Sequence, residues 1–201
     1  MDMIEINDNM LAELHSQAAA SERKRVNFDL RTTAEDGSQR MLNALMPGTQ
    51  VPIHRHPQSN ETVICLSGKL VEIIYEEDDI TKDFPMGMDA QDVPSGRRFK
   101  ESARYMLDPS VGNFGCVVPA GAWHTVEVLE PSVIFEAKDG AYGQDGSENF
   151  DPLRQLKHDI TYLIGMERLS GSMEVCSPLY ISRMLHQPLA LIEQAMREMG
   201  I

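Results

Sequence analysis

Two histidines, His54 and His56, stand one residue apart in the sequence, and Glu61 follows a short distance later. In an extended strand, residues i and i+2 point to the same side, so both imidazoles face one way. The stretch after His56 begins with Pro57 and is typical of a turn, and antiparallel pairing across that turn brings the carboxylate beside the two rings. Two imidazoles and one carboxylate form a ligand set that suits a first-row transition metal.

A fourth ligand must come from elsewhere in the chain. His124 is the strongest choice because it opens a predicted strand directly after the tight turn Pro119–Gly121. The other histidines, His15, His158 and His186, lie in segments with a helical pattern, where a lone histidine is more often a surface or capping residue than a ligand. The residues predicted to hold the metal are His54, His56, Glu61 and His124.

These ligands need a scaffold of strands, and the sequence provides the pattern for one. Polar and apolar residues alternate from Arg25 to Arg31, which is typical of a strand with one polar face. Turn signals, among them Ser67-Gly68 and Glu130-Pro131, separate the later strand candidates. These candidates are Gln39–Met46, Val51–His56, Thr62–Ser67, Lys69–Tyr75, Cys116–Val118, Trp123–Leu129 and Val133–Lys138. Many short strands with turns between them favour a β-sandwich or barrel.

Helical patterns flank this β region. Leu11, Leu14 and Ala18 recur at helical spacing near the start, and the pattern turns helical again from Asp151, with further helices at Leu179–Leu185 and Leu189–Met199. We therefore expect a helical lead-in at residues 1–24, a barrel at 25–145 and a helical extension at 146–201. A Pro- and Gly-rich insertion at about residues 84–111 forms either a lid or a solvated excursion, with a short helix near Arg98–Leu107.

The composition limits which partners and which cellular compartment suit this chain. The chain has 201 residues and a formal net charge of -13, which disfavours nucleic acid and anionic membranes as partners. No signal peptide precedes the first predicted helix, and no apolar run is long enough to span a bilayer. The three cysteines are far apart and form no CxxC pair, which fits a reducing compartment. We expect a cytoplasmic protein.

The spacing around the first ligands resembles the cupin superfamily. Its first motif begins with Gly and, after five intervening residues, continues with His-x-His. Glu follows after three or four further residues, and a second Gly after six more. Here Gly48, His54, His56, Glu61 and Gly68 satisfy every interval. An isolated His-x-His is a weak signal, but this full set of spacings is specific.

The second cupin motif is less regular in this chain. Pro119, Gly121 and His124 match its Pro-x-Gly-x-x-His core, whereas Gly112 stands one residue too far upstream and Val128 replaces the expected Asn. More narrowly, the chain is similar to cupin-fold metalloproteins of the WbuC type, a group associated with surface-polysaccharide gene clusters. The segments that carry this similarity are Arg23–Leu30, Met41–Gly48, His54–Pro57, Asn113–Gly115, Pro119–His124 and Phe135–Tyr142. The resemblance implies a mainly β cupin fold, a double-stranded β-helix or jelly-roll barrel, with an N-terminal helix and a C-terminal helical extension. It also implies one divalent transition metal (Fe, Mn, Ni, Zn or Co) at the barrel mouth.

Other polar residues are candidates for contact with a ligand. The polar strand face beginning at Arg25 faces either the barrel interior or solvent, and late in the barrel Glu136 and Lys138 alternate with Phe135 and Ala137. Glu136 is the acid/base candidate. The suggested substrate-binding residues are Arg25, Asn27, Asp29, Lys138 and Tyr142.

Three functions are compatible with these features. The first is a metal-dependent enzyme that isomerises or epimerises a small polar metabolite, such as a sugar or sugar nucleotide. The second is a non-catalytic ligand sensor whose helical tail relays the signal or dimerises, and we expect a homodimer. The third is an Fe-dependent dioxygenase, which the ligand set permits but no residue selects.

Overall fold

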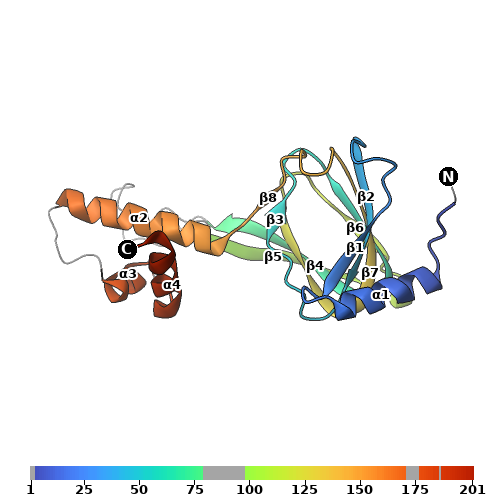
Figure 1. Ribbon diagram of the computed structural model, residues 1–201, viewed down its shortest axis with the longest axis horizontal. Coiled ribbons are helices and arrows are strands. Elements are labelled where there is room, and N and C mark those ends of the chain that lie inside the picture. The colour runs from blue at the N-terminus through green and yellow to red at the C-terminus, as the bar shows by residue number, and fades with distance from the viewer. Residues whose placement is uncertain (1–2, 79–97, 171–176, 186) are drawn as a thin grey trace. The chain divides into compact units, whose positions relative to one another are not determined.

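The computed structural model describes residues 3–78, 98–170, 177–185 and 187–201. The chain divides into two compact units, Met1–Glu76 with Glu101–Phe150 and Glu77–Lys100 with Asp151–Ile201. The first unit holds nearly all of the strand residues, and the second holds the C-terminal helices (Figure 1). The domain boundaries expected from the sequence stay a prediction.

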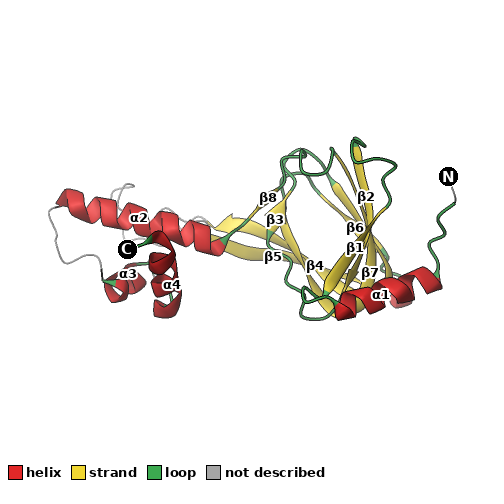
Figure 2. Ribbon diagram, in the orientation of Figure 1, coloured by secondary structure: helices red, strands yellow, loops and turns green. Residues whose placement is uncertain are grey.

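The β unit is one antiparallel sheet that curls on itself (Figure 2). One path through the sheet runs in the order β1 (Arg25–Asp29), β2 (Ser38–Leu45), β7 (Trp123–Asp139), β3 (His54–Arg55) and β8 (Glu148–Asn149). Off this path, β4 (Glu61–Asp78) pairs with β7, β5 (Arg98–Leu107) and β6 (Gly115–Val118). The long strand β7 therefore joins the two halves, because it pairs with β2, β3 and β4.

The strands β4 and β7 are continuous where the sequence predicts turns at Ser67-Gly68 and Glu130-Pro131, so both turn predictions are wrong. The pairing of the two strands instead shifts register at this point. Gly68 has a φ of +85°, and a Cβ there would lie 2.1 Å from the Pro131 carbonyl oxygen, so the close approach requires glycine. The Ser132 hydroxyl accepts a hydrogen bond from the Lys69 N–H at 2.9 Å. A β-bulge absorbs the turn-forming residues without breaking the strands.

The segment Arg98–Leu107, expected to be a short helix in an insertion, is the strand β5. It pairs with β4, and such a partner outweighs a weak local preference for helix. A 3-10 turn, η2 (Pro109–Val111), follows, and the Asp108 carboxylate accepts a hydrogen bond from the Ser110 N–H at 3.0 Å. The part of the predicted insertion at residues 84–97 lies outside the described residues.

The helix α1 (Asp8–Ala20) covers one face of the sheet. Asn7 caps it by accepting a hydrogen bond from the Met10 N–H at 3.1 Å. Its buried Leu14 and Ala18 pack on strand residues of the outer face, namely Leu42, Ala44 and Val133. A second apolar cluster comes mostly from strands, and its buried members are Leu45, Val63, Cys65, Leu70, Leu107, Val128 and Ile134. Together these clusters make the β unit a packed scaffold.

The helical unit consists of α2 (Pro152–Ser170), α3 (Pro178–Met184) and α4 (Leu189–Met199). Ile160, Ile181 and Ile192 are fully buried in its core, as the helical spacing of apolar residues predicts. Among the helices that the structure describes, none combines the length and apolar character needed to cross a bilayer. The structure confirms the predicted mainly β architecture: a curled antiparallel sheet with an N-terminal helix and C-terminal helices.

Candidate metal centre

Three separate strands bring the predicted ligands together. His54 begins β3, Glu61 begins β4, and His124 is the second residue of β7. His54 lies directly opposite His124 in the β3–β7 pair. His56 follows β3, and its ring is 5.1 Å from that of His54, centroid to centroid. One ligand atom from each of the four residues lies within 4.8 Å of the others, so the predicted set converges in space.

Glu61 is at the middle of this cluster. Its Oε2 atom lies 3.1 Å from Nε2 of His56 and 3.0 Å from Nε2 of His124. These three residues are buried, whereas His54 retains some exposure. The cluster is thus shielded from bulk water on most sides and open at His54, which suits a centre that must admit a ligand.

Each imidazole is oriented by a partner on its other nitrogen. Nδ1 of His54 lies 2.9 Å from the Pro52 carbonyl oxygen, and Nδ1 of His124 lies 3.0 Å from the Ala122 carbonyl oxygen. A carbonyl only accepts hydrogen bonds, so each Nδ1 carries the hydrogen and each Nε2 presents a lone pair to the cluster. This is the tautomer that a metal-binding histidine requires.

His56 is oriented by a side chain. Its Nδ1 lies 2.7 Å from the Ser147 hydroxyl oxygen, and that hydroxyl donates its own hydrogen to Asp145 Oδ2 at 2.7 Å. The Ser147 oxygen is therefore free to accept from the His56 Nδ1–H. Both buried Nε2 atoms then direct lone pairs toward the same carboxylate oxygen of Glu61. A cation between them removes this repulsion, so the donor set fits a bound divalent metal.

The charge states also favour ligation. Burial, with the neighbouring His124, lowers the pKa of His54 to about 4, so its ring is neutral at neutral pH. Burial alone would raise the pKa of Glu61, but the adjacent His124 and His56 side chains and the charge of Lys138 outweigh it and hold that pKa well below its usual range. The carboxylate is therefore ionised. A neutral imidazole beside an ionised carboxylate is the form that binds a metal.

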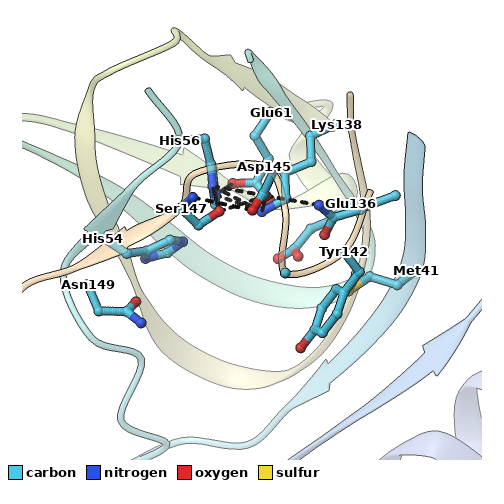
Figure 3. Close-up of a pocket in the computed structure, with 12 residues that line it drawn as sticks. Met41, His54, His56, Glu61, Glu136, Lys138, Tyr142, Asp145, Ser147 and Asn149 are labelled. Carbon is cyan, nitrogen blue, oxygen red and sulfur yellow. Dashed lines mark hydrogen bonds and ion pairs between the residues drawn. The ribbon is translucent and has the colours of Figure 1, made fainter. Parts of the chain in front are cut away.

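Two cavities adjoin the four ligands. The outer one, of about 330 Å³, is shown in Figure 3, where the side chains of His54, His56, Glu61, Lys138 and Glu136 lie around it. The inner one, of about 160 Å³, also contacts His54 and Glu61 but includes His124. The lining of the outer cavity is completed by Gln39, Met41, Tyr142, Gly143, Asp145, Ser147 and Asn149. The cluster thus forms part of the wall of both cavities.

Lys138 and Glu136 both project into the outer cavity, as the sequence suggests. Lys138 Nζ lies 3.2 Å from Asp145 Oδ2 and 3.0 and 3.1 Å from the two ring nitrogens of His56. Glu136 Oε2 accepts a hydrogen bond from the Asn43 amide at 2.7 Å. Burial, with the charge of Glu61, raises the pKa of Glu136 to about 8. One cation and one protonatable acid therefore face the same space.

Of the other suggested contact residues, some line one of the two cavities and some do not. Tyr142 lines the outer cavity and its ring stacks under the Arg31 guanidinium at 5.3 Å. Arg25 lines the inner cavity, and its guanidinium donates hydrogen bonds to the Thr49 hydroxyl and the Gln50 carbonyl. Asn27 and Asp29 are exposed and line neither of these two cavities. The structure therefore brings four of the six contact residues, Arg25, Glu136, Lys138 and Tyr142, to the site.

Sequence reasoning missed Asp145, Ser147, Gln39 and Glu72. Asp145 is buried and accepts hydrogen bonds from Gln39 Nε2 at 2.9 Å and from the Ser147 hydroxyl. No local pattern marks this loop as part of a site. Glu72 had a detectable signal, because it shares a strand face with the apolar residues Leu70 and Ile74, where a carboxyl group is unexpected.

Comparisons with known proteins give a partial family match and distant structural likenesses. A family described as "Domain of unknown function (DUF6016)" matches residues 6–84. The curated proteins contain no match to this chain. Solved structures that resemble it include the Cnp3 cupin domain of Schizosaccharomyces pombe, at 9% identity and a TM-score of 0.40, covering 58% of this chain and 65% of that one. The chain thus spans less than two thirds of that protein's solved length.

Two further structures carry catalytic descriptions. An oxalate oxidase in complex with glycolate is 12% identical with a TM-score of 0.46, covering 89% of this chain and 74% of that one. A putative sugar phosphate isomerase from Acidithiobacillus ferrooxidans is 21% identical with a TM-score of 0.38, covering 57% and 58%. These activities belong to those proteins and are not transferred to this chain.

Proposed function

We propose that this protein is a metal-binding cupin that holds one divalent transition metal with His54, His56, Glu61 and His124 and acts on a small polar metabolite. The observation that carries the proposal is the convergence of four donor groups, each in its ligating form, beside a cavity of about 330 Å³. Such a volume suits a small-molecule ligand. Fe, Mn, Ni, Zn and Co are all compatible with three imidazoles and one carboxylate.

The cavity supplies groups for proton transfer as well as binding. A bound metal would polarise a carbonyl or hydroxyl oxygen of the ligand at a coordination position that the four residues leave open. Glu136, with a pKa near 8, exchanges a proton readily at neutral pH. Lys138 places a positive charge within the same cavity, where it can stabilise negative charge that develops on the ligand.

Isomerisation or epimerisation of a sugar or sugar nucleotide fits these groups. Both reactions move a proton next to a carbonyl group, and they need an acid/base residue beside a site that polarises that carbonyl. Glu136 and the metal centre line one cavity and would serve these two roles. The resemblance to proteins associated with surface polysaccharides supports the same substrate class. Cytoplasmic location and a homodimer stay predictions.

Ligand binding at the centre can be tested without knowing the reaction. The full chain is loaded with Co(II), and its visible absorption is recorded while aldoses, sugar phosphates and sugar nucleotides are added. A spectral change with turnover supports the enzyme, and a spectral change without turnover supports a ligand sensor. No spectral change and no turnover with any of these compounds would contradict the proposal.

Glu136 gives an informative variant for this experiment. Glu136→Gln keeps an acceptor for the Asn43 amide but cannot transfer a proton, so it should retain binding and lose turnover.

Oxygen consumption by the Fe(II)-loaded protein tests the dioxygenase alternative. Oxygen uptake that depends on the sugar ligand would replace isomerisation with oxidation as the reaction.

A further inference from the structure

Glu72 is a buried carboxyl group with one oxygen atom, Oε1, that has no hydrogen-bond partner among the described residues. Its side chain lies on β4 with a relative exposure of 1%, and no described residue is hydrogen-bonded to its Oε1 atom. Burying such a group costs free energy unless something satisfies it. A buried carboxyl group with an unsatisfied oxygen atom is therefore a feature that folding alone does not explain.

This carboxyl lines the inner cavity of about 160 Å³. Three of the four predicted metal ligands, His54, Glu61 and His124, line the same cavity and connect it to the metal centre. Asn43 and Glu136 add polar groups, and four apolar side chains make up much of the remaining wall, namely Leu45, Val51, Val63 and Val126. The cavity thus combines a few hydrogen-bonding groups with aliphatic surface.

We propose that the inner cavity is a subsite for a hydroxyl-bearing aliphatic segment of the ligand, with Glu72 forming a hydrogen bond to a ligand hydroxyl. This inference rests on the proposed function, because the subsite adjoins the same metal centre. It adds a residue that recognises the ligand, and it names the chemical group that this residue recognises.

The lining selects hydroxyl groups over charged ones. An anionic group would meet the ionised carboxylate of Glu61, and the guanidinium of Arg25 is already engaged by Thr49 and Gln50. Burial, with the charges of Glu61 and Glu136, raises the pKa of Glu72 well above its ordinary value. A neutral acid both donates and accepts hydrogen bonds, as a hydroxyl group does.

The size of the cavity limits the length of this segment. A volume of about 160 Å³ equals that of roughly five water molecules at about 30 Å³ each. It accommodates three or four carbons with their hydroxyl groups. The aliphatic walls would face the C–H groups of such a segment while Glu72 and Asn43 face its oxygens.

Erythritol, a four-carbon polyol, is a suitable probe for the metal-loaded full chain. Its binding is measured by calorimetry, with putrescine as a cationic probe and succinate as an anionic one. We expect erythritol to bind and Glu72→Leu to weaken that binding by about tenfold, because a hydrogen bond to a buried group is lost. Glu72→Gln keeps a donor and an acceptor, so its affinity should stay within about threefold of wild type.

The same variants separate a binding role from a structural one. Glu72→Leu removes an unsatisfied buried group, so its melting temperature should rise while its affinity for erythritol falls. Glu130→Leu, at an exposed carboxylate on β7, serves as the control and should leave the affinity unchanged. A lower melting temperature for Glu72→Leu, or wild-type affinity for erythritol, would overturn the proposal.

Failure of this inference is distinguishable from failure of the proposed function. Metal-loaded wild type that binds a sugar ligand but not erythritol would overturn the subsite alone. Binding of putrescine that disappears in Glu72→Gln would also overturn it, because a cation needs the ionised carboxylate. A wild-type chain that retains no metal would instead overturn the proposed function.

Discussion

His54 of β3 lies directly opposite His124 of β7 in an antiparallel pair, and the centroids of their imidazole rings are 4.1 Å apart. This single pairing joins the two halves of the predicted ligand set. Because β3 contains only His54 and Arg55, the geometry of the centre depends on what holds this short strand in register.

Arg55 is the side chain placed to hold β3. Its guanidinium lies 4.6 Å from the centre of the Trp123 ring and forms an ion pair with Glu148 of β8 at 2.7 Å. Both contacts are partly exposed, so each contributes up to about 1 kcal/mol. Arg55→Ala should therefore weaken metal binding by about tenfold without removing a ligand. Competition with a chromophoric chelator measures this affinity.

The control for that experiment is Arg104→Ala, which removes ion pairs with Glu101 and Glu127 away from the ligands. Its metal affinity should equal that of wild type. If Arg55→Ala also binds metal as wild type does, β3 does not need the Arg55 contacts to present His54.

Ser147 orients His56 through the hydrogen bond to its Nδ1 atom. Removing an outer partner of a metal-binding histidine typically costs 10- to 100-fold in affinity. Ser147→Ala should show a loss of about that size, and Ser147→Thr, which keeps the hydroxyl, should restore most of it. The exposed Ser110→Ala is the control. Equal affinities for Ser147→Ala and wild type would show that His56 is held by other contacts.

Lys138 places its ammonium group beside the ring of His56, where it repels a metal cation. Lys138→Met should raise metal affinity by several-fold to about tenfold, because like charges at this distance interact strongly in a buried site. Asp145 remains satisfied by Gln39 and Ser147 in this variant. Lys69→Met is the control. A weaker metal affinity for Lys138→Met would show that the lysine supports the centre rather than competing with it.

Glu136 should make the stability of the metal-free protein depend on pH. Burial and the charge of Glu61 raise its pKa from 4.5 to about 8. Between these values the unfolded chain loses a proton that the folded protein keeps, so this contribution to stability falls as the pH rises. Glu136→Gln cannot ionise and should be more stable than wild type by a margin that grows up to about pH 8, reaching at most about 5 kcal/mol.

Thermal unfolding of both proteins across this pH range measures the margin. Added metal should shrink it, because the metal offsets the charge of Glu61 that acts on Glu136. A margin that does not change with pH would mean that Glu136 is already ionised at acidic pH.

The sequence predicted the ligand cluster because its geometry is mostly local. His54 and His56 share a strand direction, and Glu61 follows across a short turn. His124 required the spacing of the second cupin motif, which is irregular here, and the structure nonetheless brings it to the cluster. Strand periodicity and motif spacing carry this kind of information well.

Features that depend on tertiary pairing were not predictable in this way. Ser67-Gly68 has the composition of a turn, yet β7 passes alongside and the pair becomes a bulge. Arg98–Leu107 became a strand because β4 offers a pairing edge. Asp145 and Ser147 reach the site through a loop whose path depends on contacts distant in sequence. Local preference carries no information about such partners.

The central claim is that four named residues hold one metal ion, and elemental analysis tests it most directly. The wild type, His56→Ala, His124→Ala and the control His15→Ala are saturated with a divalent metal, desalted and analysed. His15 lies outside the cluster and contacts Ser67. We predict one transition-metal ion per chain in wild type and His15→Ala, and a strong reduction in both other variants. Equal metal content in all four proteins would contradict the assignment.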